Sequence, residues 1–128
     1  MKNTILVMLG CLILLANCTT LKEETSDCKV NYHETIVCNN TEIYFEELLT
    51  DSRCPIDATC VWAGEIGLRF LINGEKVELY LSPNTETKPS RKSTEQYTIE
   101  LLSVEPSPRA GVEIEAKNYI AHLKVEEN

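Results

Sequence analysis

The sequence predicts an all-β fold, a small antiparallel β-sandwich or partly open barrel of about six strands held by two disulfides. Several short segments alternate apolar and polar residues with the two-residue period of a strand. An Asn-Gly pair between two of these segments predicts a tight hairpin. After the amino-terminal leader, no segment shows a long helical period.

The hairpin at Asn73-Gly74 is the clearest local signal, because both residues of a two-residue turn need positive φ. The apolar faces of its two strands are Ile66, Leu68, Phe70 and Ile72, then Val77, Leu79 and Leu81. Two later strands carry Tyr97, Ile99 and Leu101, then Tyr119, Ala121, Leu123 and Val125. Earlier strands are indicated by Val30, Tyr32 and Ile36, and by Ile43 and Phe45. Residues 46–49 fit either a strand or a helical turn.

Residues 1–17 form a predicted signal peptide, with Lys2 followed by an apolar run shorter than the roughly 20 residues of a bilayer span. The run ends at Leu15-Ala16-Asn17-Cys18, which resembles a lipobox, although a small residue is usual where Asn17 stands. The resemblance implies that Cys18 becomes the first residue and carries fatty acyl groups such as palmitate. A plain secretory signal with an incidental cysteine is the alternative.

Three segments follow from this interpretation. Residues 1–17 are removed, residues 18–27 form a lipidated flexible tether because they are polar and aperiodic, and residues 28–128 form a single β domain. We expect the protein in the bacterial cell envelope, anchored by lipid on Cys18, at the outer membrane or cell surface if the cell is Gram-negative.

The charge of the chain excludes one class of partner. The formal net charge is −8 at pH 7, whereas nucleic-acid binding needs clustered Lys and Arg. An acidic surface permits a basic partner, but ordinary solubility explains it equally. We expect a monomer. The polar segment 82–96 holds the local basic cluster Lys88, Arg91 and Lys92, and we assign it no role.

Four cysteines remain after the leader and its boundary: Cys28, Cys38, Cys54 and Cys60. An even number in an exported domain predicts disulfides. Of the three pairings, we favour Cys28–Cys38 and Cys54–Cys60, which are close in the chain and would each contribute on the order of 2–3 kcal/mol. A four-thiolate zinc site is the rival, but its ligand spacings do not match these intervals. We therefore predict no metal and no cofactor.

Residues 51–64 form the most distinctive block, with the sequence DSRCPIDATCVWAG. It resembles the signature D-S-R-C-P-x-D-x-x-C-x-W-A-G of a family of uncharacterised bacterial envelope and secreted lipoproteins. The resemblance extends over roughly residues 43–126, through a tyrosine-led strand at 97–106 and a terminal strand at 119–125. It supports the fold and the compartment and implies no reaction, because the family has no assigned activity.

The block has an architectural and a functional interpretation. In the first, Trp62 covers the disulfide and anchors the core, Pro55 fixes φ, Asp57 bonds nearby backbone, and Arg53 pairs with Asp51 or Asp57. In the second, Arg53, Pro55 and Asp57 belong to a rigid, protruding binding loop that loses little entropy on docking.

Catalytic patterns are missing from the sequence. His33 and His122 lie on the polar phase of predicted strands, and no G-x-S-x-G, H-E-x-x-H or Walker pattern occurs. We therefore expect a protein that is not an enzyme: a non-catalytic envelope domain that binds a protein or other ligand. The first alternative is an inhibitor of an exported hydrolase, a protease or lysozyme, that acts through a disulfide-rigidified loop. A structural surface protein is the other.

Overall fold

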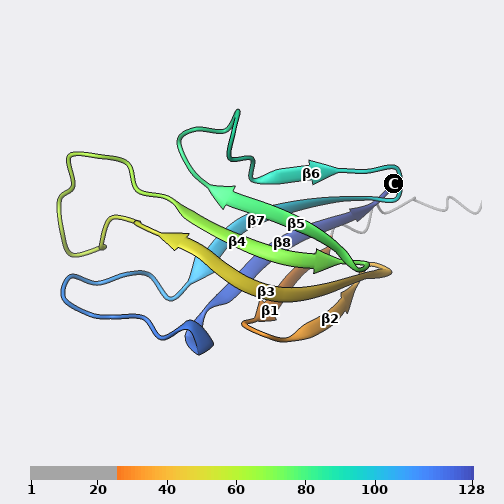
Figure 1. The fold of residues 1–128 in the computed structure, drawn as a ribbon, viewed down its shortest axis with the longest axis horizontal. Helices are drawn as coiled ribbons and strands as arrows, with labels where there is room; N and C mark the ends of the chain where they lie inside the picture. The colour runs from red at the N-terminus through yellow and green to blue at the C-terminus, as the bar shows by residue number, and fades with distance from the viewer. Residues whose placement is uncertain (1–25) are drawn as a thin grey trace, which may run out of the picture.

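The structure, a computed structural model, describes residues 26–128 as two antiparallel four-stranded sheets that pack as a sandwich (Figure 1). The predicted signal peptide, Cys18 and most of the predicted tether lie outside the described residues. The first sheet has the order β1-β8-β7-β6 and the second the order β2-β3-β4-β5. The all-β prediction is confirmed, and the arrangement is a sandwich rather than a closed barrel.

The strands have the following bounds, in chain order. They are β1 (Ser26–Asn31), β2 (Thr35–Cys38), β3 (Thr41–Asp51), β4 (Ile66–Ile72), β5 (Glu75–Leu81), β6 (Arg91–Ser93), β7 (Tyr97–Glu105) and β8 (Ile120–Glu127). A single 3-10 turn, Ala116–Asn118, precedes β8. Strand β1 begins two residues before the predicted domain boundary at residue 28, so Ser26 and Asp27 belong to the sheet.

The core lies between the sheets and follows the predicted alternation. The largest side chains excluded from solvent are Phe45, Phe70, Ile43, Ile66, Leu68, Ile72, Leu79, Ile99, Leu101 and Leu123. Phe45 and Phe70 lie opposite each other on β3 and β4, with ring centroids 5.2 Å apart. Period-two patterning therefore determines which face of each strand is buried.

The strand count differs from the sequence prediction at two places. The expected strand at residues 30–36 is divided between β1 and β2, which belong to different sheets, by a turn in which His33 has φ of 58°. The short strand β6 lies inside the predicted polar loop 82–96. Eight strands result where about six are expected from apolar periodicity. A three-residue polar edge strand has no such periodicity.

Two local predictions have clear outcomes. The Asn73-Gly74 turn is confirmed, with φ of 49° and 82°. Residues 46–49 belong to strand β3 and not to a helical turn. Bulges between Phe45 and Glu47 and between Leu48 and Thr50 explain why strict alternation fails there, since each shifts the phase of the side chains.

Both predicted disulfides are confirmed. Cys28 on β1 is bonded to Cys38 on β2, so this bridge joins the edges of the two sheets. Cys54 is bonded to Cys60 within a loop. The two bridges indicate an extracytoplasmic location, because thiols are kept reduced in the cytosol. Among residues 26–128, no helix is long and apolar enough to cross a membrane.

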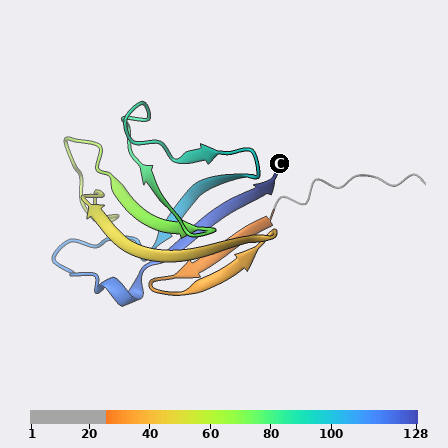
Figure 2. The ribbon, with the colours of Figure 1, turned by 45° about the vertical axis from the view of Figure 1, so that its right-hand side comes forward.

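The two ends of the sandwich are unlike each other. One end holds Ser26, Asn128 and the short turns at 39–40 and 73–74. The opposite end, at the left of Figures 1 and 2, holds the long loops 52–65, 82–90 and 106–119. Loops positioned by a rigid sandwich are where binding residues are concentrated, so a site is expected at the long-loop end.

Candidate functional site at the long-loop end

The loop 52–65 is closed at its base by a short neck. The Ser52 N–H donates to the Glu65 carbonyl at 2.7 Å, and the Glu65 N–H donates to Ser52 Oγ at 3.2 Å. Gly64 lies directly against the opposite strand of the neck. A Cβ at Gly64 would lie 2.6 Å from the Cα of Arg53 and 2.7 Å from the carbonyl carbon of Ser52. The glycine is thus required by close backbone approach.

Arg53 ties this neck to the neighbouring loop. Its Nε and Nη2 donate to the two carboxylate oxygens of Asp51, each at 2.9 Å. Its Nη1 donates to the Val104 carbonyl at 2.9 Å, and Nη2 also donates to the Pro106 carbonyl at 3.0 Å. The Arg53 and Asp51 side chains are only 17% and 12% exposed. Of the two partners expected for Arg53, the structure selects Asp51, and the guanidinium is not free to contact another molecule.

Tyr119 completes the network beneath the loops. Its hydroxyl donates to Asp51 Oδ2 at 2.7 Å. Burial raises the pKa of Asp51, but the hydrogen bonds from Arg53 and Tyr119 outweigh burial and hold the pKa below its ordinary value. Burial and the bond to Asp51 raise the pKa of Tyr119 to about 12. The carboxylate is therefore ionised and the phenol neutral at physiological pH.

This pair of shifts predicts how Tyr119→Phe changes the response to alkali. The unfolded chain releases the Tyr119 proton near pH 10, and the folded chain near pH 12. The free energy of unfolding should therefore fall as pH rises between these values. Tyr119→Phe should lack this part of the decrease in stability with pH. Near neutral pH it should be about 2 kcal/mol less stable than wild type, because it loses the hydrogen bond to a charged oxygen. Urea unfolding across this pH range measures both, with Tyr44→Phe on the outer face of β3 as control. Equal pH slopes for wild type and Tyr119→Phe would contradict the prediction.

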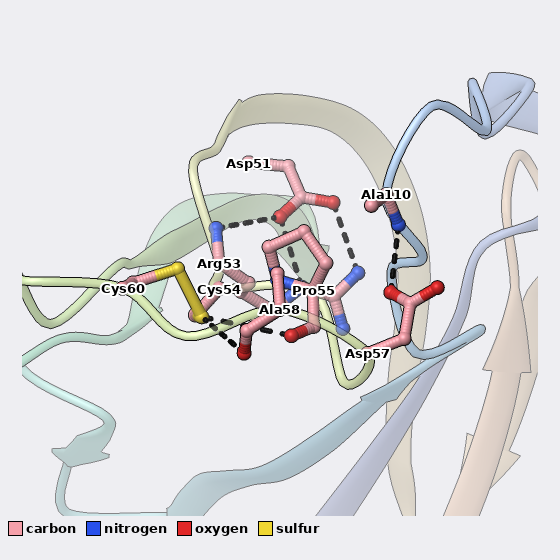
Figure 3. Close-up of a disulfide and its surroundings, with 8 residues drawn as sticks. All are labelled: Asp51, Arg53, Cys54, Pro55, Asp57, Ala58, Cys60 and Ala110. Atoms are coloured by element: carbon pink, nitrogen blue, oxygen red, sulfur yellow. Dashed lines mark hydrogen bonds and ion pairs between the residues drawn. A yellow bond between two sulfur atoms is a disulfide. The ribbon is translucent and has the colours of Figure 1, made fainter.

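The tip of loop 52–65 is bonded to loop 106–119 at two further points, of which Figure 3 shows the contact between Asp57 and Ala110. The Ile56 N–H donates to the Pro108 carbonyl at 3.0 Å, and Asp57 Oδ1 accepts from the Ala110 N–H at 2.8 Å. The Ala58 N–H donates to the Pro55 carbonyl at 3.1 Å, which closes a turn inside the Cys54–Cys60 ring. Asp57 thus bonds backbone as predicted, but on a different loop. The two loops form one braced unit.

The prediction that Trp62 anchors the core is wrong. Its side chain is 65% exposed, and the neighbouring Val61 is 94% exposed. Trp62 lies in the loop between β3 and β4, outside both strands. Phe45 and Phe70 are instead the largest fully buried side chains of the core.

The exposed apolar side chains are concentrated on this unit. Six large apolar residues are exposed among residues 26–128: Val37, Ile56, Val61, Trp62, Leu102 and Val112. Four of them lie on loops 52–65 and 106–119, and we call Ile56, Val61, Trp62 and Val112 the apolar tip. Isolated exposed apolar residues need no explanation, but four on two hydrogen-bonded loops make this unit a candidate interaction surface.

A pocket of about 380 Å³ lies beside the apolar tip, between the two loops and the end of β3. Its lining comprises Leu48, Asp51, Arg53, Pro55, Pro108, Arg109, Val112, Glu113, Ile114 and Tyr119. Of the three residues that the sequence assigns to a binding loop, Arg53 and Pro55 line this pocket, while Asp57 braces the loop above it. Sequence reasoning missed Arg109, Val112 and Glu113, which have no motif around them.

The third long loop, 82–90, does not form a free basic patch. Lys88 pairs with Glu65, to which Ser82 Oγ also donates at 3.0 Å. The other two members of the predicted basic cluster are paired as well. Lys92 lies 3.1 Å from Glu75, and Arg91 lies 3.9 Å from Glu126. Each of the three positive charges lies beside a carboxylate, which leaves little positive field for an acidic partner.

The two histidines lie apart from the apolar tip. His33 is exposed, as expected, and its ring stacks on Tyr32 with centroids 3.9 Å apart. His122 is half-buried rather than exposed, because Glu105 lies next to it on the paired strand with a side-chain contact of 2.8 Å. Neither histidine is hydrogen-bonded to a hydroxyl or thiol nucleophile among residues 26–128.

No protein-family model, no curated protein and no solved structure matches the chain. The braced loops, the apolar tip and the pocket are therefore the features that bear on function.

Proposed function

We propose that the protein is a non-catalytic binding domain, held at the bacterial cell envelope by lipid on Cys18, that contacts a partner protein through its apolar tip. The observation that carries the proposal is the exposure of Trp62, Val61 and Ile56 on loop 52–65. This loop is braced by the Ser52–Glu65 bonds, by the Arg53–Asp51 pair and by the bond from Ala110 to Asp57. Envelope placement is supported by the two disulfides and by the lipobox-like end of the leader.

The bracing matters because binding is opposed by the entropy of ordering loops. A loop already fixed by a disulfide and by bonds to its neighbour loses little freedom on docking. Trp is among the residues that most often dominate binding energy, since one side chain supplies a large apolar area. A rigid loop that presents an exposed Trp is therefore better suited to recognition than to internal packing.

The orientation of the sandwich also favours this function. The described chain begins at Ser26, at the end of the sandwich opposite the apolar tip (Figure 2). A lipid anchor on the amino-terminal side of Ser26 therefore joins the domain at the end farthest from the tip. An anchor at that end would leave the long loops accessible to a partner, which supports the proposal.

Inhibition of an exported hydrolase is the alternative proposal. The Pro55–Ala58 turn makes the disulfide ring compact, whereas proteases bind extended segments by strand-like pairing. A lysozyme is the better match among hydrolases, because it is basic and this chain carries a net charge of −8. Titration of lysozymes and a protease panel tests this alternative. Nanomolar inhibition would support it, and none at micromolar concentration would remove it.

Affinity capture with matched variants tests the main proposal. Residues 19–128, which contain all eight strands and both disulfides, are immobilised in oxidised form and exposed to envelope extract and to extracellular fluid. We expect Trp62→Ala with Val61→Ser to weaken the retained interaction about 30-fold, since truncating a binding hot spot costs 2 kcal/mol or more. Val37→Ser is the control, because Val37 is 73% exposed on β2, away from the long loops.

The pattern across the three proteins decides the result. A partner retained by wild type and Val37→Ser but lost by the tip variant supports recognition through the tip. Equal retention by all three would show that the tip is not the contact surface. The lipid anchor is tested separately, by palmitate labelling of the exported full chain. Label that persists after Cys18→Ser would exclude Cys18 as the acceptor.

A further inference from the structure

The pocket beside the apolar tip is built from segments that are already fixed. Loop 52–65 contributes Arg53 and Pro55, and strand β3 contributes Leu48 and Asp51. Loop 106–119 contributes the other lining residues, Pro108, Arg109, Val112, Glu113, Ile114 and Tyr119. The bonds from Ile56 to Pro108 and from Asp57 to Ala110 hold the two loops at a set distance. The pocket therefore exists before any ligand binds, as most small-molecule sites do.

The polar groups inside the pocket are already satisfied. The Asp51 carboxylate accepts four hydrogen bonds, three from the side chain and backbone of Arg53 and one from Tyr119. The Arg53 guanidinium makes further bonds to two backbone carbonyls. A ligand gains little from these groups, because each is neutralised and bonded within the protein. Recognition is left to the apolar wall and to the two remaining charged residues.

The apolar wall and the rim give the pocket its chemical character. Leu48, Pro55, Pro108, Val112 and Ile114 form the wall. Arg109 and Glu113 lie on either side of Val112 in the chain and carry opposite charges. Among residues 26–128, neither side chain has an ion pair or a hydrogen bond, although every other arginine does. A hydrogen bond from the Val112 N–H to the Arg109 carbonyl fixes the turn that carries them.

We propose that this pocket binds a small apolar zwitterion, an apolar amino acid or a short peptide of such residues with both ends free. The ligand's carboxylate pairs with Arg109, its ammonium group pairs with Glu113, and its side chains contact the apolar wall. A volume of about 380 Å³ is near the lower limit of ligand sites, roughly 300–1,000 Å³, which suits one to three small residues. This site shares Val112 with the apolar tip but does not use Trp62 or Val61, so it does not depend on partner recognition by Trp62.

Isothermal titration calorimetry with defined probes tests the proposal. It uses the full chain, which is exported, oxidised and purified in detergent. Leucine, Leu-Leu and Leu-Leu-Leu compare ligand length and so distinguish an amino acid from a peptide. Acetyl-Leu-Leu lacks the ammonium group and Leu-Leu amide lacks the carboxylate. We expect saturable heat for at least one free-ended probe, and about tenfold or more weaker binding of each blocked form of Leu-Leu, the loss typical of a charge-assisted contact. Gly-Gly, which has no apolar side chains, should give no saturable heat.

Two variants test which residue pairs with each charged end of the ligand. Arg109→Gln should remove the discrimination between Leu-Leu and its amide, and Glu113→Gln should remove the discrimination between Leu-Leu and its acetylated form. Both residues are exposed, so the variants should fold. The tip variant Trp62→Ala with Val61→Ser should bind the probes as wild type does, which separates this site from the proposed partner surface. No saturable heat from any leucine probe at about 10 mM, well above a millimolar dissociation constant, would overturn the proposal. Equal binding of blocked and free forms would overturn it too.

Discussion

Replacing Arg53 with methionine is expected to lower the free energy of unfolding by about 4 kcal/mol, a value typical of removing one partner of a buried ion pair. Methionine keeps much of the side-chain volume but donates no hydrogen bond. The variant leaves the Asp51 carboxylate 12% exposed and without its counter-ion, and removes the side-chain donors to the Val104 and Pro106 carbonyls. The cost is mostly that of buried groups left unpaired.

Arg69→Met is the matched control for this change. Arg69 also pairs with two carboxylates, those of Glu47 and Glu78, but these lie on the outer face of the second sheet and are about half exposed. Exposed pairs contribute roughly 0–1 kcal/mol, so this variant should be close to wild type. Urea unfolding of both variants at neutral pH measures the difference. Equal losses would show that the Asp51–Arg53 pair acts as an ordinary surface pair.

The same pair predicts a response to acid. The pKa of Asp51 is lowered from its ordinary value of 3.8, so its stabilising contribution is present above that pH and is lost as pH falls through the lower, folded value. The stability gap between wild type and Asp51→Asn should therefore narrow below pH 3.8. A gap that is constant with pH would mean that Asp51 titrates alike in the folded and unfolded states.

Much of the fold could be predicted because the signals are local. The Asn73-Gly74 hairpin and the buried faces of β4, β5, β7 and β8 follow from turn chemistry and period-two alternation within short segments. The disulfide pairing followed from closeness in the chain. The division of residues 30–36 between two sheets could not be predicted, because one continuous apolar pattern fits either one strand or two.

The candidate site was predicted less well because its contacts join distant segments. The block at 51–64 correctly indicates a loop closed by a disulfide. Its bonds run to Val104, Pro106, Pro108 and Ala110, more than forty residues away, and spacing within the block carries no information about them. Trp62 was misassigned for the same reason. An aromatic residue next to a disulfide is consistent with burial or with display, and only the positions of the surrounding strands decide between them.

Gly64→Ala is expected to destabilise the protein by about 3 kcal/mol, at the upper end of the usual cost of overpacking. The new Cβ would meet the backbone of Ser52 and Arg53, which has no rotamer by which to move aside. Relief requires the neck to open, and opening breaks the hydrogen bonds between Ser52 and Glu65. It also displaces Arg53 from Asp51, so the damage should extend from the loop to the network beneath it.

Ala63→Ser is the control, because it adds one atom at the adjacent residue, which is exposed. Urea unfolding measures the global loss, and hydrogen exchange of the Ser52 and Ile56 amides measures loosening of the neck and of the brace to Pro108. In Gly64→Ala both amides should exchange faster, while amides in the centre of β4 remain protected. Unchanged stability together with faster exchange of both amides would mean that the neck opens at almost no cost in free energy. The loop would then not be rigid, and Trp62 would be presented on a flexible segment that has to be ordered whenever a partner binds.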